Sequence, residues 1–337
     1  MSYLKAYVLK ETNGPGSLKF EDVELGALKS NEVVIKLKAA SLNRRDFFIT
    51  HGMYPGMKLN SILGSDGAGE IYAIGDEINT FSVGDEVIIN PSINWGDRDD
   101  INSDQFNVLG MPSNGTFAEF IIVPIENVHK KPPYLSWEEA SAIPLAALTA
   151  YRALITRGQL QKNETVLIPG IGSGVALYAL QIAAAFGAKV IVTSSSNEKI
   201  EKAKDLGAVA GFNYREKDWY KKLKIEFGLV NLSIDGVGGE SFNRLIDLTA
   251  QGGRIVTYGA TNGPVPQTVL PKIFFKNMDI RGTTMGSPRE FKQMLAFFEE
   301  HKIKPVLDKS YTFTDVIQAL HHMGEGSNFG KITIRIP

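Results

Sequence analysis

The sequence contains no cysteine, and this absence excludes several kinds of chemistry. Without thiols the chain forms no disulfide, has no thiolate nucleophile, and binds neither an iron–sulfur cluster nor zinc through cysteine. No apolar run approaches the roughly 18 residues that a membrane span needs. The start of the chain, "MSYLKAYVLKETNGPG", also lacks the apolar core of an export signal. We therefore expect a cytoplasmic protein with no membrane partner.

An excess of charge of one sign is lacking as well. The formal net charge is -1, which gives no electrostatic reason to expect nucleic acid or an anionic membrane as a partner. Hydrophobic residues at 43% and charged residues at 22% are ordinary values for a soluble globular protein. A chain of 337 residues exceeds one ordinary core, so the length predicts one large or two medium domains.

Two patterns divide the chain. Residues 1–124 carry short β-type runs such as "EVVIKLKAAS" and "GDEVIIN" between turns rich in glycine, proline, asparagine and aspartate, which is typical of a β-rich domain. Over residues 125–285 helices alternate with six candidate strands, which predicts a doubly wound parallel sheet of the dinucleotide-binding (Rossmann) type. Residues 286–337 supply two helices and a strand, too little for a domain, so we expect them to pack on the β-rich part. The predicted class is α/β.

A long connection over residues 91–114 interrupts the β-rich part and exceeds what compact domains usually tolerate unless the loop has a function. Four acidic residues within it suggest either a cation site or a solvated loop: Asp97, Asp99, Asp100 and Asp104. A solvated loop is the commoner origin of such a charge run, so we predict no metal here.

A glycine-rich turn is the main chemical signal. In "VLIPGIGSGVALYALQIAAAFGAKVIVTSSS", residues 166–196, a strand, a turn, a helix and a second strand follow one another. The candidate turn residues are Gly170, Gly172, Ser173, Gly174 and Val175. The turn departs from the G-x-G-x-x-G pattern by one position and, taken alone, also fits a flexible loop without ligand. In this context, the helix N-terminus favours a pyrophosphate and hence a dinucleotide.

The second strand ends in serines where an NAD-binding protein places an acid. An acid repels a ribose 2′-phosphate, whereas the hydroxyls of Ser194 and Ser195 and the nearby Lys199 can hydrogen-bond and neutralise it. The pattern predicts NADPH as the cofactor. "SSSNEK" also fits a cap for the next helix, and capping is compatible with phosphate binding.

Several segments together resemble the medium-chain dehydrogenase/reductase superfamily, in particular its zinc-free quinone oxidoreductase-like branch. They follow in the family's order over essentially the whole chain: "SLNRRDFFITHGMYPG", "LGSDGAGEIYAIGDEINTFSVGDEV", "LTAYRAL", the glycine turn, "KDLGAVAGFNYREKDW" and "GGRIVTYG". The resemblance implies a GroES-like catalytic domain over 1–124 and 286–337, a Rossmann NADP-binding domain over 125–285, and hydride transfer.

The same resemblance assigns cofactor contacts and speaks against a metal. It implies that Ser194, Lys199 and Tyr214 contact the 2′-phosphate, and that the following residues line the cofactor: Asp235, Gly236, Val237, Gly259 and Ala260. The catalytic zinc ligands of relatives correspond to Asn43, Ser65 and Leu145, none of which replaces a thiolate or imidazole well. The loop after Asn90 resembles the lobe that holds a structural zinc in relatives, without its cysteines.

Three residues are candidates for the catalytic site, and each also fits a structural role. Asn43 resembles an active-site residue but also a helix cap, because an acid follows three positions later. Tyr54 either faces the substrate or braces a turn. Thr149 resembles the family threonine near the nicotinamide, or simply packs within a helix. The histidines at 51, 321 and 322 fit surface positions better than chemistry.

These observations favour a zinc-independent NADPH-dependent reductase of quinones, enones or other activated carbonyls. A second class stays open, in which the protein binds NADPH but has vestigial catalysis and a structural, sensory or RNA-binding role; the near-neutral charge disfavours RNA. The sixth strand of the Rossmann part, "DIRGTTMG", fits a sheet edge that pairs with its copy, which predicts a homodimer.

Overall fold

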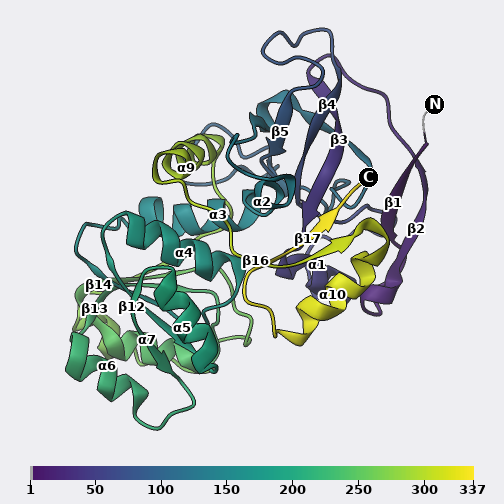
Figure 1. Cartoon of the computed structure of the whole chain (residues 1–337). Coiled ribbons are helices and arrows are strands. Elements are labelled where there is room, and N and C mark those ends of the chain that lie inside the picture. The colour runs from purple at the N-terminus through teal and green to yellow at the C-terminus, as the bar shows by residue number, and fades with distance from the viewer. Residues whose placement is uncertain (1–2) are drawn as a thin grey trace. The chain divides into compact units, whose positions relative to one another are not determined.

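The computed structural model describes residues 3–337, so residues 1 and 2 of the predicted domain 1–124 lie outside it. The chain divides into a first unit, Met1–Ala146 with Gly286–Pro337, and a second unit, Ala147–Met285 (Figure 1). The first unit extends beyond the predicted boundary at residue 124 because β9 (Val128–Lys130) pairs with β5 (Glu86–Ile89). The predicted domain boundary between residues 124 and 125, which comes from the family resemblance, stays a prediction.

The first unit is built on a seven-stranded sheet. The sheet runs in the order β16-β17-β3-β4-β5-β9, and β8 also pairs with β3. β3 (Glu32–Ser41) and β4 (Asp66–Ile74) form a long antiparallel pair. The remaining elements of this unit are β1 (Tyr3–Leu9), β2 (Leu18–Glu24), α1 (Arg44–Thr50), β6 (Ser92–Ile93), β7 (Asn107–Val108), β8 (Phe120–Pro124), α2 (Trp137–Ser141), α9 (Pro288–His301), β16 (Leu307–Thr312), α10 (Val316–Glu325) and β17 (Lys331–Arg335).

The C-terminal segment completes the first unit. β17 pairs antiparallel with β3 and parallel with β16. Residues Ile332 and Ile334 of β17 and Val316 and Leu320 of α10 are buried in the same core as β3. The expectation that residues 286–337 pack on the β-rich part therefore agrees with the structure. β16 is an additional strand that the sequence did not indicate.

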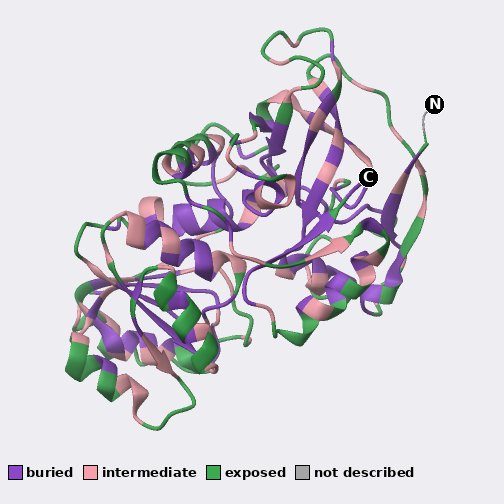
Figure 2. Cartoon of the chain, in the orientation of Figure 1, coloured by how far each residue is buried: buried purple, intermediate pink, exposed green. Residues whose placement is uncertain are grey.

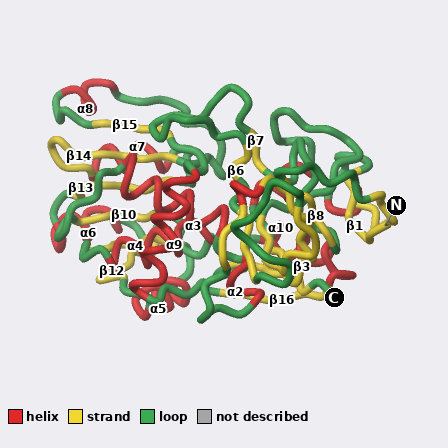
Figure 3. The backbone as a smooth tube through the Cα atoms, turned by 90° about the horizontal axis from the view of Figure 1, so that it is seen from above, coloured by secondary structure: helices red, strands yellow, loops and turns green. Residues whose placement is uncertain are grey.

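The second unit is a six-stranded, entirely parallel sheet in the order β12-β11-β10-β13-β14-β15 (Figure 3). Its elements are β10 (Thr165–Ile168), α4 (Gly174–Ala185), β11 (Lys189–Ser194), α5 (Asn197–Asp205), β12 (Ala208–Asn213), α6 (Trp219–Phe227), β13 (Val230–Asp235), α7 (Ser241–Leu248), β14 (Thr249–Thr257), α8 (Leu270–Phe274) and β15 (Asp279–Gly282). This order is the doubly wound arrangement that binds dinucleotides, so the predicted fold class is confirmed.

The central strands of the second unit are buried on both faces, as a parallel sheet between helix layers requires (Figure 2). Val166, Ile191, Leu232 and Ile255 have no exposed surface. The boundary between the units falls within α3 (Pro144–Tyr151), which continues into a π-helix over Arg152–Arg157. No helix within residues 3–337 combines the length and apolar character that crossing a membrane takes.

Candidate active site

Helix α1 fixes Asn43 at its N-cap. The Asn43 N–H donates to the Asp46 carboxylate at 2.8 Å, which forms the capping box that the sequence indicated. Asn43 is only 6% exposed, and its side-chain amide is engaged at both ends. Its Nδ2 donates to Asp66 Oδ2 at 2.9 Å, and its Oδ1 accepts from Lys331 Nζ at 2.8 Å. The cap is therefore real, and the amide is held in one orientation.

A buried ion pair surrounds that amide. Lys331 Nζ lies 3.0 Å from Asp66 Oδ2, and the two side chains are 4% and 0% exposed. The third Lys331 donor is taken by the Leu42 carbonyl at 2.8 Å, and Asp66 Oδ1 accepts the N–H of Leu145 at 2.8 Å. A buried pair of this kind is tolerated because every donor and acceptor finds a partner.

Arg45 extends the same cluster to Tyr54. Its Nη1 donates to Ser65 Oγ at 2.5 Å and to the Leu109 carbonyl at 2.9 Å, and its Nη2 donates to the Met111 carbonyl at 3.2 Å. Its Nε donates to the Tyr54 hydroxyl at 3.3 Å, and its guanidinium carbon lies 4.8 Å from the centre of that ring. The Arg45 charge also acts on Asp46, which accepts the N–H of Asn43, so two predicted catalytic residues, Asn43 and Tyr54, belong to one electrostatic cluster.

Asp46 is the least satisfied member of the cluster. It is fully buried, and its Oδ1 has no hydrogen-bond partner. Burial raises the pKa of this carboxyl to about 6, against the opposing effects of the Arg45 charge and the Asn43 N–H. The carboxyl of Asp46 therefore titrates close to neutral pH.

The glycine turn of the second unit begins α4. Gly170 and Gly172 have φ values of 68° and 127°, a region that favours glycine. Ser173 is the N-cap of α4, and its hydroxyl accepts the N–H of Ala176 at 3.4 Å. Gly174 and Val175 are the first two residues of α4, so their N–H groups have no acceptor within the helix. Free N–H groups at the positive end of a helix fit a pyrophosphate.

The ends of β13 and β14 lie against this turn. A methyl group on Gly170 would come within 2.8 Å of Val237, and one on Gly236 would come within 2.4 Å of the Tyr258 ring. Burial raises the pKa of Tyr258, while a hydrogen bond with Ser173 acts in the opposite direction. Tyr258 therefore links the end of β14 to the glycine turn, and the sequence reasoning missed it.

Asp235 shapes the turn after β13. Its two carboxylate oxygens accept the N–H groups of Val237 at 3.0 Å and Gly238 at 3.1 Å. Burial raises the pKa of Asp235, and the two backbone hydrogen bonds oppose the shift. Gly259 and Ala260 approach the same turn, since a methyl group on Gly259 would lie 3.4 Å from the Gly236 carbonyl and one on Gly238 would lie 2.9 Å from the Ala260 side chain.

The predicted 2′-phosphate residues gather at the ends of β11 and β12. The Ser194 hydroxyl accepts the N–H of Ser196 at 3.2 Å, and the Ser194 carbonyl accepts the N–H of Tyr214 at 3.0 Å. Asn213 donates to the Ser195 carbonyl at 3.3 Å. Ser196 caps α5 and accepts the N–H of Lys199 at 3.3 Å, so the capping interpretation of "SSSNEK" holds for Ser196.

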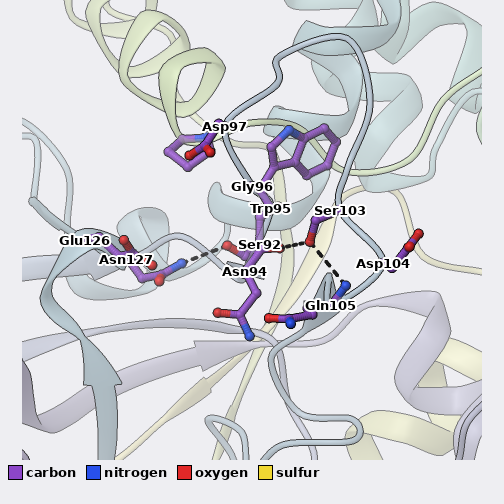
Figure 4. Close-up of a pocket in the computed structure, with 11 residues that line it drawn as sticks. Ser92, Asn94, Trp95, Gly96, Asp97, Ser103, Asp104, Gln105, Glu126 and Asn127 are labelled. Carbon is purple, nitrogen blue, oxygen red and sulfur yellow. Dashed lines mark hydrogen bonds between the residues drawn. The ribbon is translucent and has the colours of Figure 1, made fainter.

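Two further predicted features lie elsewhere. Thr149 is 6% exposed on α3 of the second unit. The long loop of the first unit borders a polar cavity of about 510 Å³, lined by Ser92, Asn94, Trp95, Gly96, Asp97, Ser103, Asp104, Gln105, Glu126, Asn127 and Pro288 (Figure 4). Asn127 and Ser103 hold the loop there through the carbonyls of Ser92 and Asn94. No predicted site residue lines this cavity.

The acids of the loop bind partners of the protein itself. Asp99 accepts from the Ser287 hydroxyl at 2.8 Å and pairs with Arg289 at 2.8 Å. Asp100 pairs with Arg98 at 2.5 Å. The Asp99 contacts fasten the loop to the start of α9, and the Asp100 pair lies within the loop.

Comparisons with known proteins place this geometry in a family. The chain is 36% identical over 331 residues to a zinc-type alcohol dehydrogenase-like protein of Leptosphaeria maculans, covering 91% of each. It is 36% identical to a protein of the same description from Schizosaccharomyces pombe, covering 99% of each. Residues 29–133 match the family model "Alcohol dehydrogenase GroES-like domain", and residues 174–300 match "Zinc-binding dehydrogenase". The chain belongs to the medium-chain dehydrogenase/reductase superfamily.

A solved structure agrees with this membership. The structure described as an NAD-dependent alcohol dehydrogenase superposes with a TM-score of 0.94 at 34% identity, over 99% of this chain and 100% of that one. As a member of the superfamily, the protein is an oxidoreductase that acts on a small molecule with a nicotinamide cofactor. The second unit fits such a cofactor, because its glycine turn presents free N–H groups beside Val237 and Tyr258.

The family names imply zinc, but the residues of the first unit do not fit it. The resemblance assigns the catalytic ligand positions to Asn43, Ser65 and Leu145. Asp66 and Lys331 hold the amide of Asn43, Arg45 holds the hydroxyl of Ser65, and Leu145 has no side-chain atom that could bind a metal. Arg45 and Lys331 donate to the side-chain oxygens of Ser65 and Asn43, the atoms that could otherwise bind a metal ion. Among residues 3–337, no group of three or more acidic or histidine side chains is arranged to hold a metal.

Sequence reasoning missed three members of the polar cluster in the first unit, Arg45, Asp66 and Lys331, and it missed Tyr258 beside the glycine turn of the second unit. Lys331 could have been found from the sequence, because it stands among the apolar residues of the strand "GKITIRI", and a charge buried in a strand needs a partner of opposite charge. Arg45 and Asp66 left a weaker signal. Asp66 lies next to the ligand position at Ser65, and Arg45 lies two residues after the one at Asn43. A charge near these positions is informative only once the metal ligands are known to be replaced.

Proposed function

We propose that the protein is a cytoplasmic, zinc-independent reductase that transfers hydride from NADPH to a quinone, an enone or another activated carbonyl. The observation that carries this proposal is the replacement of the metal ligands. Oxidation of a simple alcohol needs stabilisation of an alkoxide, which a zinc ion provides as a Lewis acid. With Asn43, Ser65 and Leu145 in the ligand positions, an acceptor that is already electrophilic is the better substrate.

Relatives support the substrate class. The human quinone oxidoreductase is 29% identical over 335 residues, and an acryloyl-coenzyme A reductase of Sulfurisphaera tokodaii is 29% identical over 326 residues. Both names describe reduction of electrophilic acceptors. The zinc-type relatives at 36% identity point to alcohols instead, and the residues at the ligand positions of this chain favour the electrophilic acceptors.

The end of β11 supports NADPH. No acid stands there, and Ser194, Ser195, Lys199 and Tyr214 supply hydroxyls and one ammonium group around the expected 2′-phosphate. The solved structure at 34% identity is named as NAD-dependent, which makes NADH the cofactor to exclude by experiment.

The chemistry of an enone illustrates the roles. NADPH supplies a hydride when bound. The β-carbon of the acceptor receives the hydride with its two electrons, the π electrons move to the carbonyl oxygen, and a proton from solvent completes the saturated carbonyl. The residues of the first unit bind and orient the acceptor, and the Tyr54 hydroxyl donates a hydrogen bond to the oxygen on which charge develops.

The test is a comparison of reactions on metal-free protein. We expect oxidation of NADPH by a panel of quinones and enones to be much faster than reduction of NADP by ethanol or benzyl alcohol, each at saturating cofactor. Alcohol oxidation without quinone or enone reduction would assign the other reaction class. Binding of NADPH with no turnover of any acceptor would favour a cofactor-binding protein without catalysis.

A further inference from the structure

Arg45 is a buried cation whose contacts are all uncharged. It is 8% exposed and donates to the Ser65 hydroxyl, the Tyr54 hydroxyl and the carbonyls of Leu109 and Met111. Among residues 3–337, no carboxylate oxygen lies within 4.0 Å of the guanidinium. Buried arginines are ordinarily paired, because an unpaired buried charge costs several kcal/mol.

The neighbouring carboxylates are committed elsewhere. Asp66 pairs with Lys331 and accepts from Asn43 and Leu145. Asp46 accepts the N–H of Asn43, and its other oxygen has no partner at all. The Arg45 charge acts on the Asp46 carboxyl, whose pKa it lowers against the effect of burial, but no hydrogen bond or ion pair joins the two side chains. The hydrogen bonds of Arg45 all go to uncharged groups, and two of these groups are the hydroxyls of Ser65 and Tyr54.

Among the residues that Arg45 hydrogen-bonds, Tyr54 is the one with a partly exposed side chain. Unlike Ser65, which has no exposed surface, Tyr54 is partly exposed. Arg45 Nε donates to its oxygen, so the hydroxyl proton must point to another acceptor. Within residues 3–337 no acceptor for that proton is present. A hydroxyl whose oxygen accepts a hydrogen bond from a cation is a stronger donor, so Tyr54 can donate its own proton strongly to an oxygen that gains negative charge.

We propose that Arg45 is a positioning residue that takes the place of the metal: it holds the Tyr54 hydroxyl and supplies the fixed positive charge that stabilises the oxyanion of the acceptor. This inference rests on the proposed function, since it names the group that compensates for the missing Lewis acid. Arg45 acts through Tyr54 and not by touching the acceptor, because Arg45 is only 8% exposed and three of its four other N–H groups donate to protein oxygens.

A purely structural role is the competing explanation. By binding the carbonyls of Leu109 and Met111, Arg45 also fastens the end of the long loop, and its loss would destabilise the first unit. Arg254 is the matched control: a largely buried arginine of the second unit that donates to the Gly158 carbonyl at 2.6 Å and pairs with Glu164 at 2.5 Å. Arg254→Gln removes comparable contacts outside the cluster.

Turnover supplies the first readout. We expect Arg45→Gln and Tyr54→Phe each to lower kcat for an enone by about 10²-fold or more, with the KM for NADPH unchanged. Arg45→Lys, which keeps the charge, is expected to recover a large part of kcat. The double variant is expected to be no slower than the slower single variant, because both changes remove one unit. Fully additive losses, or a loss in Arg254→Gln as large as in Arg45→Gln, would overturn the inference.

Binding of an anion supplies a readout that needs no turnover. The p-nitrophenolate anion resembles the charged oxygen of the acceptor, and its absorbance reports binding. We expect it to bind about tenfold more weakly to Arg45→Gln than to the unaltered protein, and Arg45→Lys to lie between them. If the unaltered protein reduces no quinone or enone but this dependence on Arg45 holds, the proposed function fails and the cationic site stands. Equal phenolate binding in all variants, with normal turnover, refutes the inference alone.

Discussion

Lys199 is the only ammonium group among the residues expected to bind the 2′-phosphate. Its N–H is fixed by the cap of α5, so its side chain starts from a defined position near Ser194 and Tyr214. We expect Lys199→Ala to weaken NADPH binding by about 1 to 3 kcal/mol, the scale of a charge-assisted contact, and to leave NADH nearly unchanged. Fluorescence titration with both cofactors measures this, with the exposed Lys202→Ala on the same helix as the control. Equal affinity of the unaltered protein for NADPH and NADH would contradict the assignment.

Asp46 makes stability depend on pH in an unusual direction. Its pKa is raised by burial to about 6, so the folded state holds its proton more tightly than the unfolded state. The associated stability is present below the unfolded pKa near 4 and is lost as the pH rises through about 6. We expect the unfolding free energy of the wild type to fall by about 2 to 3 kcal/mol relative to Asp46→Asn between pH 4 and 7.5.

Denaturant unfolding across this pH range tests the prediction. The asparagine keeps an oxygen that can accept the N–H of Asn43, so the cap is preserved while the titration is removed. Glu290→Gln, in the buried capping box of α9, controls for loss of a capping carboxylate. Parallel pH profiles for the wild type and Asp46→Asn would show that Asp46 does not titrate in this range.

At the residue scale, the sequence identified which residues belong to the site better than it identified the residues that they hydrogen-bond. It predicted the capping box at Asn43 because an asparagine and an aspartate three residues apart interact locally. The interactions of Asn43 with Asp66 and Lys331 span 23 and 288 positions in the chain, and no local pattern reports them. The same holds for Arg45 and the carbonyls of Leu109 and Met111, whose contact exists only once the long loop has folded.

At the element scale, His129 of β9 lies under α9 without a hydrogen-bond partner for Nε2. Its ring centre is 4.7 Å from that of Phe291. Burial, with a smaller effect of Lys292, lowers the pKa of His129 to about 4. A histidine kept neutral by folding contributes stability that is present above its unfolded pKa near 6.5 and is lost as the pH falls through 4.

We expect His129→Phe to flatten this acid loss, which in the wild type amounts to about 2 to 3 kcal/mol between pH 6.5 and 4. The aromatic ring is retained against Phe291, so packing between β9 and α9 changes little. Thermal unfolding at several pH values measures the slope, and the exposed His301→Phe on α9 controls for removal of a histidine. An unchanged slope in His129→Phe would mean that another group causes the acid loss.

Elements with a strong local period were predictable and the others were not. Three strands of the second unit, β10, β11 and β13, were identified because each is a largely apolar run that ends at proline, serine or aspartate, and the alternation with helices indicated the others. β16 escaped because "LDKSYT" is polar at most positions and is held by its parallel pairing with β17. β9 belongs to the first unit because it pairs with β5, and the sequence of its three residues does not predict that pairing.

At the scale of the whole molecule, family resemblance and alternation of elements predicted two units, since they extend over the whole chain. The boundary within α3 was not predicted, because a helix that crosses between two compact units has no compositional break. The oligomeric state is also a property of the whole molecule. Evidence on it comes from β15, the strand at one edge of the parallel sheet in the second unit.

β15 is an edge strand of the parallel sheet, and apolar side chains are exposed around it. Four apolar residues of α8 and β15 and directly after α8 are exposed: Leu270 at 65%, Phe274 at 58%, Phe275 at 74% and Ile280 at 41%. Natural proteins rarely leave an edge strand and large apolar side chains in water together. A second copy that pairs through β15 covers both, and a twofold axis makes the contact self-complementary. We therefore propose a homodimer.

The variant Phe275→Glu/Ile280→Lys tests this proposal. It places charges on β15 and directly after α8 without changing the buried core. We expect the unaltered protein to be a dimer at micromolar concentration and the variant to be a monomer that keeps its fold. Ile225→Glu is the control, because Ile225 is 87% exposed on α6 and lies outside the patch. Sedimentation equilibrium distinguishes the species, and circular dichroism checks the fold. A dimer that persists in the double variant would move the interface elsewhere, and a monomeric unaltered protein would leave the apolar edge without the partner proposed for it.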